Sequence, residues 1–219
     1  MLRLLFEKTG NAVWISHLDL MRLFQRAFKR ANLPLKHTQG YNPRPSVSIA
    51  LPLSVGVESK CELLDFDLDG ESVNCEDICS RLNRYLVKGV KVLGVYDAGM
   101  KIRDLAYLRC AITLEYDAGV PDDTEFNITE LFAREALVVT KSTKNGVKEI
   151  DVIPMIRSIH VHREGDNQIQ IEAVICCQNP TLNPVQLVQA ICEYLPQYSP
   201  DFSKCCRIEI YNKNDEKFR

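Results

Sequence analysis

Hydrophobic and polar positions along this chain predict short strands and amphipathic helices in a repeated order. Residues 2–6 form a short apolar run, and Ser16 can cap a helix that Asn32 and Pro34 bring to an end. The apolar residues of this first helix recur at helical spacing, as Met21, Phe24, Ala27, Phe28 and Ala31. One side of the helix is therefore expected to face a core.

Two strand-like runs follow at residues 46–51 and 61–68, and a second helix and a fourth strand complete the order β-α-β-β-α-β by residue 96. In the run at residues 61–68, apolar residues alternate with Asp65 and Asp67. Such alternation is typical of a half-buried strand, so these carboxylates are expected on its solvent side.

After a segment of mixed charge at residues 98–106, the same order of elements returns. Asn145-Gly146 lies between two extended runs and predicts a hairpin that extends the second strand of this half. Asn183 and Pro184 are expected to cap and open the last helix.

The sequence thus predicts an α+β fold of two ferredoxin-like βαββαβ halves in tandem, with antiparallel sheets and helices on one face. The first half spans residues 1–98 and carries the first helix and a loop rich in Gly and Pro. The second spans residues 107–212 and carries the hairpin insertion, and residues 213–219 are expected to form a flexible tail.

The composition limits where this protein works and what it binds. The chain has 219 residues with 46% hydrophobic content, which suffices for one sizeable core or two small ones. No uncharged apolar stretch approaches the roughly 20 residues of a membrane helix, and no secretion signal is visible. We therefore expect a cytoplasmic protein without membrane contact, whose nine cysteines are reduced. The net charge of -2 argues against a protein that coats nucleic acid with its whole surface.

Positive charge is concentrated on the first helix and the loop behind it. The cations and the aromatic residue of this basic segment are Arg22, Arg26, Lys29, Arg30, Lys36, Tyr41 and Arg44. Guanidinium groups bind phosphate in bidentate geometry and Tyr41 can stack on a base, which indicates a site for RNA or another phosphate-rich ligand. The alternative is a solvated helix face that the acidic run at residues 65–69 neutralises.

His17 and His37 flank the basic helix and are candidates for general acid and base catalysis, with Asp19 orienting one of them. This reading predicts metal-independent cleavage of RNA. Asp19 is equally well explained as part of the helix cap and as the i, i+3 partner of Arg22.

Two groups of residues are candidates for a metal site. Cys75 and Cys79 begin like a radical-SAM cluster motif, but Leu82 stands where the third thiolate is needed, so both are interpreted as the inward face of a helix. The second group comprises His160, His162, Cys176, Cys177, Cys205 and Cys206. Adjacent cysteines on a strand point to opposite faces, so no metal is expected here either.

Three segments carry a resemblance to a known family: residues 16–22 (SHLDLMR), 40–45 (GYNPRP) and 51–59 (LPLSVGVES). They resemble an uncharacterised bacterial family of radical-SAM-linked proteins, whose members are encoded beside, or fused behind, a radical-SAM protein. The family usually has histidine at the position of Arg44. The resemblance implies that this chain is the stand-alone partner, and that the iron–sulfur cluster and S-adenosylmethionine are bound by the radical-SAM protein and not by this chain.

The leading hypothesis is a non-catalytic accessory protein that binds a phosphate-bearing substrate, RNA, and presents it to a radical-SAM partner. One alternative is a metal-independent endoribonuclease-like enzyme, because His17 and His37 flank the basic helix. Paired ferredoxin-like halves with a basic helix also resemble CRISPR-type RNA-processing endoribonucleases, which is an analogy of fold alone. The other is a protein adaptor without a role in nucleic-acid binding.

Overall fold

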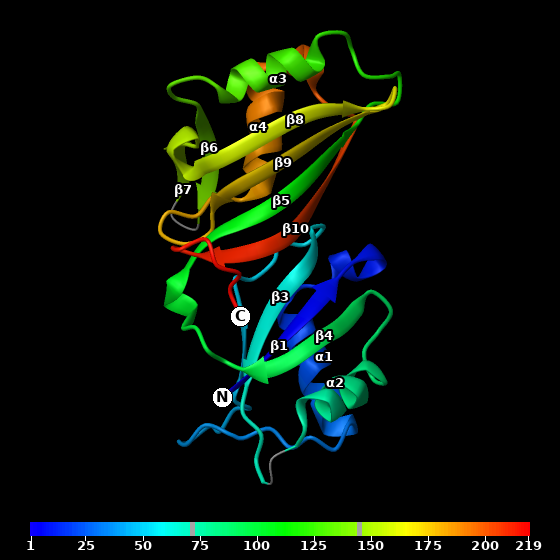
Figure 1. Ribbon diagram of the computed structural model, residues 1–219, viewed down its shortest axis with the longest axis vertical. Helices are drawn as coiled ribbons and strands as arrows, with labels where there is room; N and C mark the ends of the chain where they lie inside the picture. Colours follow the sequence, from blue (N-terminus) through cyan, green and yellow to red (C-terminus); the bar gives the residue numbers. More distant parts are fainter. Residues whose placement is uncertain (71–72, 144–145) are drawn as a thin grey trace. The chain divides into compact units, whose positions relative to one another are not determined.

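The computed structural model describes residues 1–70, 73–143 and 146–219 (Figure 1). In this part of the chain it has four α-helices and mostly antiparallel strands, which confirms the predicted α+β class. The chain divides into two compact units: unit 1 comprises Met1–Asp104 and Phe218–Arg219, and unit 2 comprises Leu105–Lys217. Among the described residues, no helix combines the length and apolar character needed to cross a membrane.

Unit 1 follows the order β-α-β-β-α-β. Its elements are β1 (Leu2–Lys8), the 3-10 helix η1 (Gly10–Trp14), α1 (His17–Arg30), β2 (Val47–Ala50), β3 (Glu58–Phe66), α2 (Cys75–Asn83), β4 (Val90–Asp97) and the 3-10 helix η2 (Ile102–Asp104). The strand order is β4-β1-β3-β2, and each of these neighbours is antiparallel.

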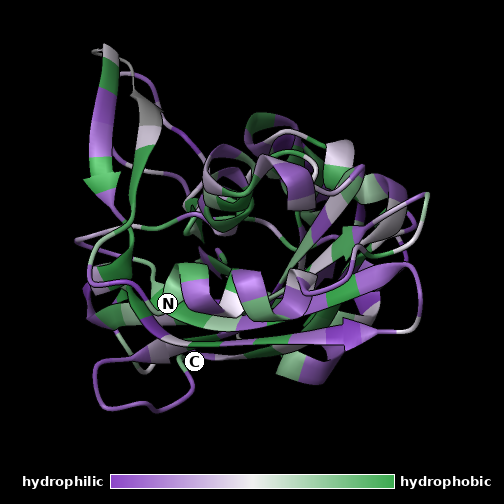
Figure 2. Ribbon diagram, turned by 90° about the horizontal axis from the view of Figure 1, so that it is seen from above, coloured by the Kyte–Doolittle hydropathy of each residue, from purple (hydrophilic) through white to green (hydrophobic). Residues whose placement is uncertain are grey.

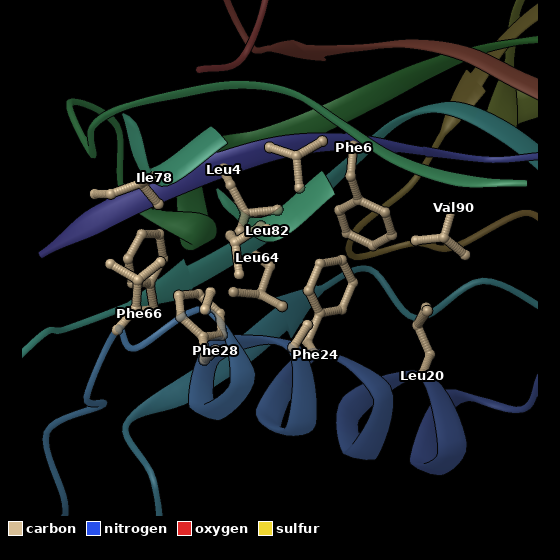
Figure 3. Close-up of a cluster of buried hydrophobic side chains, with 14 of the residues drawn as sticks. Leu4, Phe6, Leu20, Phe24, Phe28, Leu64, Phe66, Ile78, Leu82 and Val90 are labelled. Atoms are coloured by element: carbon tan, nitrogen blue, oxygen red, sulfur yellow. The ribbon is translucent and has the colours of Figure 1, made fainter. Parts of the chain in front are cut away.

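The core of unit 1 lies between the sheet and its helices. In Figure 3, Phe24 and Phe28 of α1 point toward the strands, where Phe24 meets Phe6 with ring centroids 4.8 Å apart and Phe28 meets Phe66 at 4.9 Å. Such aromatic pairs contribute about 0.5–1.5 kcal/mol each beyond their buried area. Ile78 of α2 belongs to the same buried cluster, so both helices cover one face of the sheet.

The ends of α1 follow from local chemistry, as the sequence predicted. The Ser16 side chain accepts a hydrogen bond from the backbone N–H of Asp19 at 3.2 Å, which satisfies one of the free donors of the first turn. At the other end Asn32 adopts a left-handed φ of 54°, a conformation that asparagine tolerates, and Pro34 follows. Hydrophilic and hydrophobic residues alternate along the helices and strands (Figure 2), as expected for elements with one face on a core.

Asp65 is buried, against the expectation that it faces solvent. Its carboxylate accepts two hydrogen bonds from the Arg3 guanidinium, from Nε at 2.6 Å and from one terminal nitrogen at 2.9 Å. Arg3 lies opposite Asp65 in the β1–β3 register, and its side chain is fully buried. The charged partner on the neighbouring strand allows this carboxylate to be buried, because a buried charge must be paired.

Unit 2 repeats the order with an additional hairpin. Its elements are β5 (Leu105–Glu115), α3 (Thr124–Phe132), β6 (Val138–Thr143), β7 (Gly146–Asp151), the 3-10 helix η3 (Ile153–Met155), β8 (Ile156–Glu164), β9 (Gln168–Cys176), α4 (Pro184–Tyr194), the 3-10 helix η4 (Pro196–Tyr198) and β10 (Phe202–Asn212). The strand order is β10-β5-β9-β8, antiparallel throughout.

The hairpin insertion is present, but it does not extend a strand of the main sheet. β6 and β7 pair only with each other among the described strands, and form a two-stranded sheet of their own. The turn residues Lys144 and Asn145 lie outside the described residues. Tyr194 of α4 donates a hydrogen bond to the carbonyl oxygen of Val138 at 2.8 Å, so this sheet is attached to a helix.

The last helix begins as predicted, and within the predicted tail at residues 213–219 one side chain, Phe218, packs into unit 1. Asn183 caps α4 in a capping box with Gln186. Phe218 is fully buried, and the Arg3 guanidinium lies 4.9 Å from the centre of its ring. An aromatic ring over a buried cation explains this packing, because the cation–π contact and the apolar area both favour an ordered position.

Candidate functional site: the basic face of α1

Four exposed cations, Arg22, Arg26, Lys29 and Arg30, lie on the outer face of α1. Only Arg22 has an ion-pair partner in the described part of the chain, since it donates to the Asp19 carboxylate at 2.9 Å. Both side chains of this pair are more than half exposed, and exposed pairs contribute little to stability. The other three cations remain available to an external anion, and Arg22 keeps further N–H donors beyond the nitrogen that binds Asp19.

Two of the three carboxylates in the acidic run at residues 65–69 have partners other than the cations of α1. Asp65 binds Arg3, and Asp67 lies 3.3 Å from the N-terminal amine of Met1. Asp67 also accepts a hydrogen bond from the Ser46 hydroxyl at 3.3 Å. These contacts count against the alternative in which the acidic strand neutralises the charge of the basic helix.

Three of the α1 cations line a cavity of about 480 Å³, here called the Pro45 cavity. Its polar lining consists of Arg22, Gln25, Arg26, Lys29 and His37. Its apolar lining consists of Phe28, Leu33, Pro34, Leu35 and Pro45. A cavity with a charged rim and an apolar floor can hold a flat, partly apolar group that carries a negative charge.

A second cavity of about 370 Å³, here called the Val87 cavity, also adjoins the helix. Its lining consists of Ile15, Asp19, Arg22, Leu23, Arg26 and Val87. Hydrogen bonds from the Ser16 hydroxyl and the Arg22 guanidinium lower the pKa of Asp19, so its carboxylate stays ionised below the usual pH range. The Val87 cavity therefore combines two cations with one anionic acceptor.

The loop rich in Gly and Pro is closed by backbone hydrogen bonds. The Thr38 N–H donates to the Arg44 carbonyl oxygen at 2.8 Å, and the Ser46 N–H donates to the Lys36 carbonyl oxygen at 2.6 Å. Tyr41, near the tip, is fully exposed. Lys36, Tyr41 and Arg44 are exposed but line neither cavity, so the structure brings only part of the predicted set together.

His17 and His37 occupy different positions relative to the Pro45 cavity. His17 is the first residue of α1 and does not line the cavity, whereas His37 follows the end of that helix and lines it together with Arg22. Asp19 bonds to Ser16 and Arg22, which matches its reading as a cap residue and ion-pair partner.

Lys8 supports the start of α1 from inside unit 1. Its buried ammonium donates to the carbonyl oxygens of Val13 at 3.1 Å and Ile15 at 2.8 Å. Burial lowers the pKa of Lys8, and the negative charge of Glu62 opposes this shift. Two carbonyls held by one cation fix the segment that leads into the basic helix.

The histidine and cysteine groups are not arranged as a metal site. Strand pairing places His160 and Cys206 in one row across the sheet of unit 2, but β9 and β5 separate their strands, a distance of about 14 Å. Cys177 and Cys205 are buried, which raises the pKa of each thiol to about 11. No cluster of three metal-binding side chains occurs among the described residues.

The cysteines of α2 are only partly on its inward face. Ile78 and Leu82 are fully buried, whereas Cys75 and Cys79 are half-buried and line a cavity of about 300 Å³. Burial raises the pKa of the Cys79 thiol, which favours its protonated form.

Sequence reasoning missed the residues that give the basic face its shape. Gln25 and Leu23 lie within α1, and their i+3 and i+4 spacing from Arg22 and Asp19 offered a signal. Leu35, Pro45 and Val87 come from outside the helix, and no local pattern places them beside it.

Comparisons with known proteins show a likeness of fold and a family. No curated protein matches the chain. One similar solved structure, titled "Crystal Structure of a Cbf5-Nop10-Gar1 Complex", aligns with 95% of this chain at 9% identity and a TM-score of 0.53, which shows a likeness of fold alone. This chain spans about half (48%) of the length of that chain. A second, titled "Crystal Structure of an Unknown Protein from Galdieria sulphuraria", has 10% identity over 94% of this chain and 96% of that chain. Its TM-score of 0.27 is too low to indicate a shared fold.

The family comparison covers most of the chain. Residues 1–184 match the family described as "Uncharacterized protein conserved in bacteria (DUF2344)". The match includes all of α1, the loop behind it and both cavities. The chain therefore belongs to this family of uncharacterised bacterial proteins.

Proposed function

We propose that this chain is an accessory protein that binds RNA through the basic face of α1 and presents it to a radical-SAM partner. The observation that carries the RNA-binding half is the exposed set Arg26, Lys29 and Arg30, which has no ion-pair partner in the described residues. Arg26 lines both partly apolar cavities and Lys29 lines the Pro45 cavity. Cations supply affinity for phosphates, and partly apolar recesses supply a surface for unpaired bases.

The partner half of the proposal rests on the resemblance of residues 16–22, 40–45 and 51–59 to radical-SAM-linked proteins. In this arrangement the iron–sulfur cluster and S-adenosylmethionine belong to the partner. In this proposal the role of this chain is to hold the substrate, because the exposed cations of α1 can bind phosphates.

We further infer that both units are ferredoxin-like. The order is β4-β1-β3-β2 in unit 1 and β10-β5-β9-β8 in unit 2. In both units, numbered by their place in the chain, the four strands of the main sheet therefore lie in the order 4-1-3-2. This order is expected of two interleaved β-α-β units with helices on one face. The β6–β7 hairpin is then an insertion in the second unit.

The RNA-binding half is tested by replacing Arg26, Lys29 and Arg30 with alanine. Alanine keeps the helix, and Arg22 is left in place so that its pair with Asp19 survives. Loss of three phosphate contacts is expected to weaken binding of a single-stranded RNA by about 100-fold at 0.1 M salt, and to reduce the slope of log affinity against log salt by about 2. Fluorescence anisotropy over a salt series measures both quantities.

A charge-matched control replaces three exposed lysines elsewhere, Lys60, Lys101 and Lys213, with alanine. This variant is expected to bind RNA within about twofold of the natural chain. Equal losses in the two variants would show that net charge, and not the α1 face, governs binding.

The partner half is tested by purifying the tagged chain from its own cells at low salt, with and without nuclease. We expect a radical-SAM protein to co-purify together with RNA that added salt releases. A radical-SAM protein that is retained while RNA is absent would contradict the substrate-presenting role and favour a protein adaptor.

A further inference from the structure

Arg22 and Arg26 stand between the two cavities. They line the Pro45 cavity on one side of α1 and the Val87 cavity on the other. At i, i+4 spacing their Cβ atoms are about 5–6 Å apart, so both guanidinium groups can reach one phosphate. The two cavities, about 480 and 370 Å³, fall within the roughly 300–1,000 Å³ that is usual for small-ligand sites. The arrangement matches a ligand in which one phosphate separates two flat groups.

We infer that this site takes single-stranded RNA as a dinucleotide step, with one unpaired base in each cavity and the intervening phosphate on Arg22 and Arg26. The inference rests on the proposed RNA-binding function, and adds to it the strand conformation and a base preference. The apolar surface of Leu33 and Leu35 in one cavity, and of Val87 in the other, suits the faces of bases. Duplex RNA does not satisfy the site, because its bases are stacked and paired and cannot enter separate cavities.

Asp19 gives the Val87 cavity a preference among bases. A carboxylate has about four lone-pair sites, and the Ser16 hydroxyl at 2.8 Å and the Arg22 guanidinium at 2.9 Å each occupy one. The remaining acceptors suit the exocyclic amine of cytosine, which carboxylates recognise in nucleic acids. Uracil presents a carbonyl oxygen at the same position, so that two hydrogen-bond acceptors would face each other. The cavity therefore favours cytosine over uracil.

The test compares four RNA probes on the full chain by fluorescence anisotropy. Three are single strands of matched phosphate number: hexacytidylate, hexauridylate and an abasic ribose-phosphate hexamer. The fourth is a hairpin duplex, which carries more phosphates, so weaker binding of this probe would not reflect a lower charge. Hexacytidylate is expected to bind about tenfold more tightly than hexauridylate. The abasic hexamer and the duplex are expected to bind at least tenfold more weakly than hexacytidylate, since neither can place bases in the cavities.

Two variants localise the preference. Asp19→Ala removes the acceptor while leaving Ser16 to cap the helix, and is expected to bring hexacytidylate and hexauridylate to within about twofold of each other. Val87→Met partly fills the Val87 cavity without adding charge at a position that is 44% exposed, and is expected to reduce the preference in the same way. This second variant keeps the test valid if the first disturbs the helix.

The possible outcomes distinguish base insertion into the cavities from the proposed RNA-binding function. An abasic hexamer or a duplex that binds as tightly as hexacytidylate would overturn base insertion, while the phosphate-binding function would stand. Equal affinity for hexacytidylate and hexauridylate in the natural chain would overturn the role of Asp19. Failure of all four probes to bind would overturn the proposed function itself.

Discussion

Replacing Asp65 with alanine is expected to lower the free energy of unfolding by about 3–5 kcal/mol. The change removes both hydrogen bonds of the Arg3 guanidinium, at 2.6 and 2.9 Å, and leaves a fully buried cation without its counter-charge. The ring of Phe218, 4.9 Å away, supplies a cation–π contact of at most about 2 kcal/mol and cannot replace a carboxylate. Urea denaturation followed by circular dichroism measures the loss.

Two further variants separate the cost of a broken pair from the value of the pair. Arg3→Met combined with Asp65→Leu removes both charges, and is expected to restore most of the lost stability because apolar side chains of similar volume avoid desolvation. Arg81→Ala breaks the partly exposed i, i+4 pair with Asp77, and should cost under about 0.5 kcal/mol. If Asp65→Ala lowered the free energy of unfolding no more than Arg81→Ala does, the buried pair of Arg3 and Asp65 would not contribute to stability as expected.

Replacing Gly89 with alanine is expected to cost about 3–5 kcal/mol. Gly89 has φ of +90°, where a Cβ atom is strained by about 1–2 kcal/mol. The added methyl group would also overlap the Thr9 carbonyl oxygen and lie 2.9 Å from the Ala12 Cβ, so the backbone must move at a further cost of about 1–3 kcal/mol. The Gly89 carbonyl accepts a hydrogen bond from the Thr9 N–H at 2.7 Å, which that movement would break.

Gly10 provides the matched control for Gly89. It also has a positive φ, +55°, but a Cβ atom there would meet nothing within 4 Å. Gly10→Ala is therefore expected to show the conformational cost alone, about 1–2 kcal/mol. Equal losses in the two variants, measured by thermal unfolding, would argue against close packing between Gly89 and η1.

The elements that sequence reasoning located well are those defined by neighbouring residues. The cap at Ser16, the stop at Pro34 and the capping box at Asn183 each depend on side chains within a few positions. The basic face of α1 was predicted for the same reason, since helical spacing alone places Arg22 and Arg26 together.

The features that sequence reasoning missed depend on residues far apart in the chain. Asp65 follows a pattern that predicts exposure, and only the pairing of β1 with β3 brings Arg3, 62 positions earlier, against it. Val87 reaches the α1 face from the segment before β4, and Phe218 joins unit 1 from the end of the chain. The spacing of hydrophobic residues, with a period of two in strands and 3.6 in helices, does not predict contacts between residues that are far apart in the sequence.

Trp14 is the only tryptophan in the sequence, and it lies in η1 with 68% of its surface exposed. Its indole faces Gly56, whose added Cβ would sit 3.5 Å from the ring. Intrinsic tryptophan fluorescence therefore originates from unit 1 alone, while circular dichroism sums over both units. Denaturation curves from these two signals would coincide if the units unfold as one cooperative system, and would separate if each melts on its own.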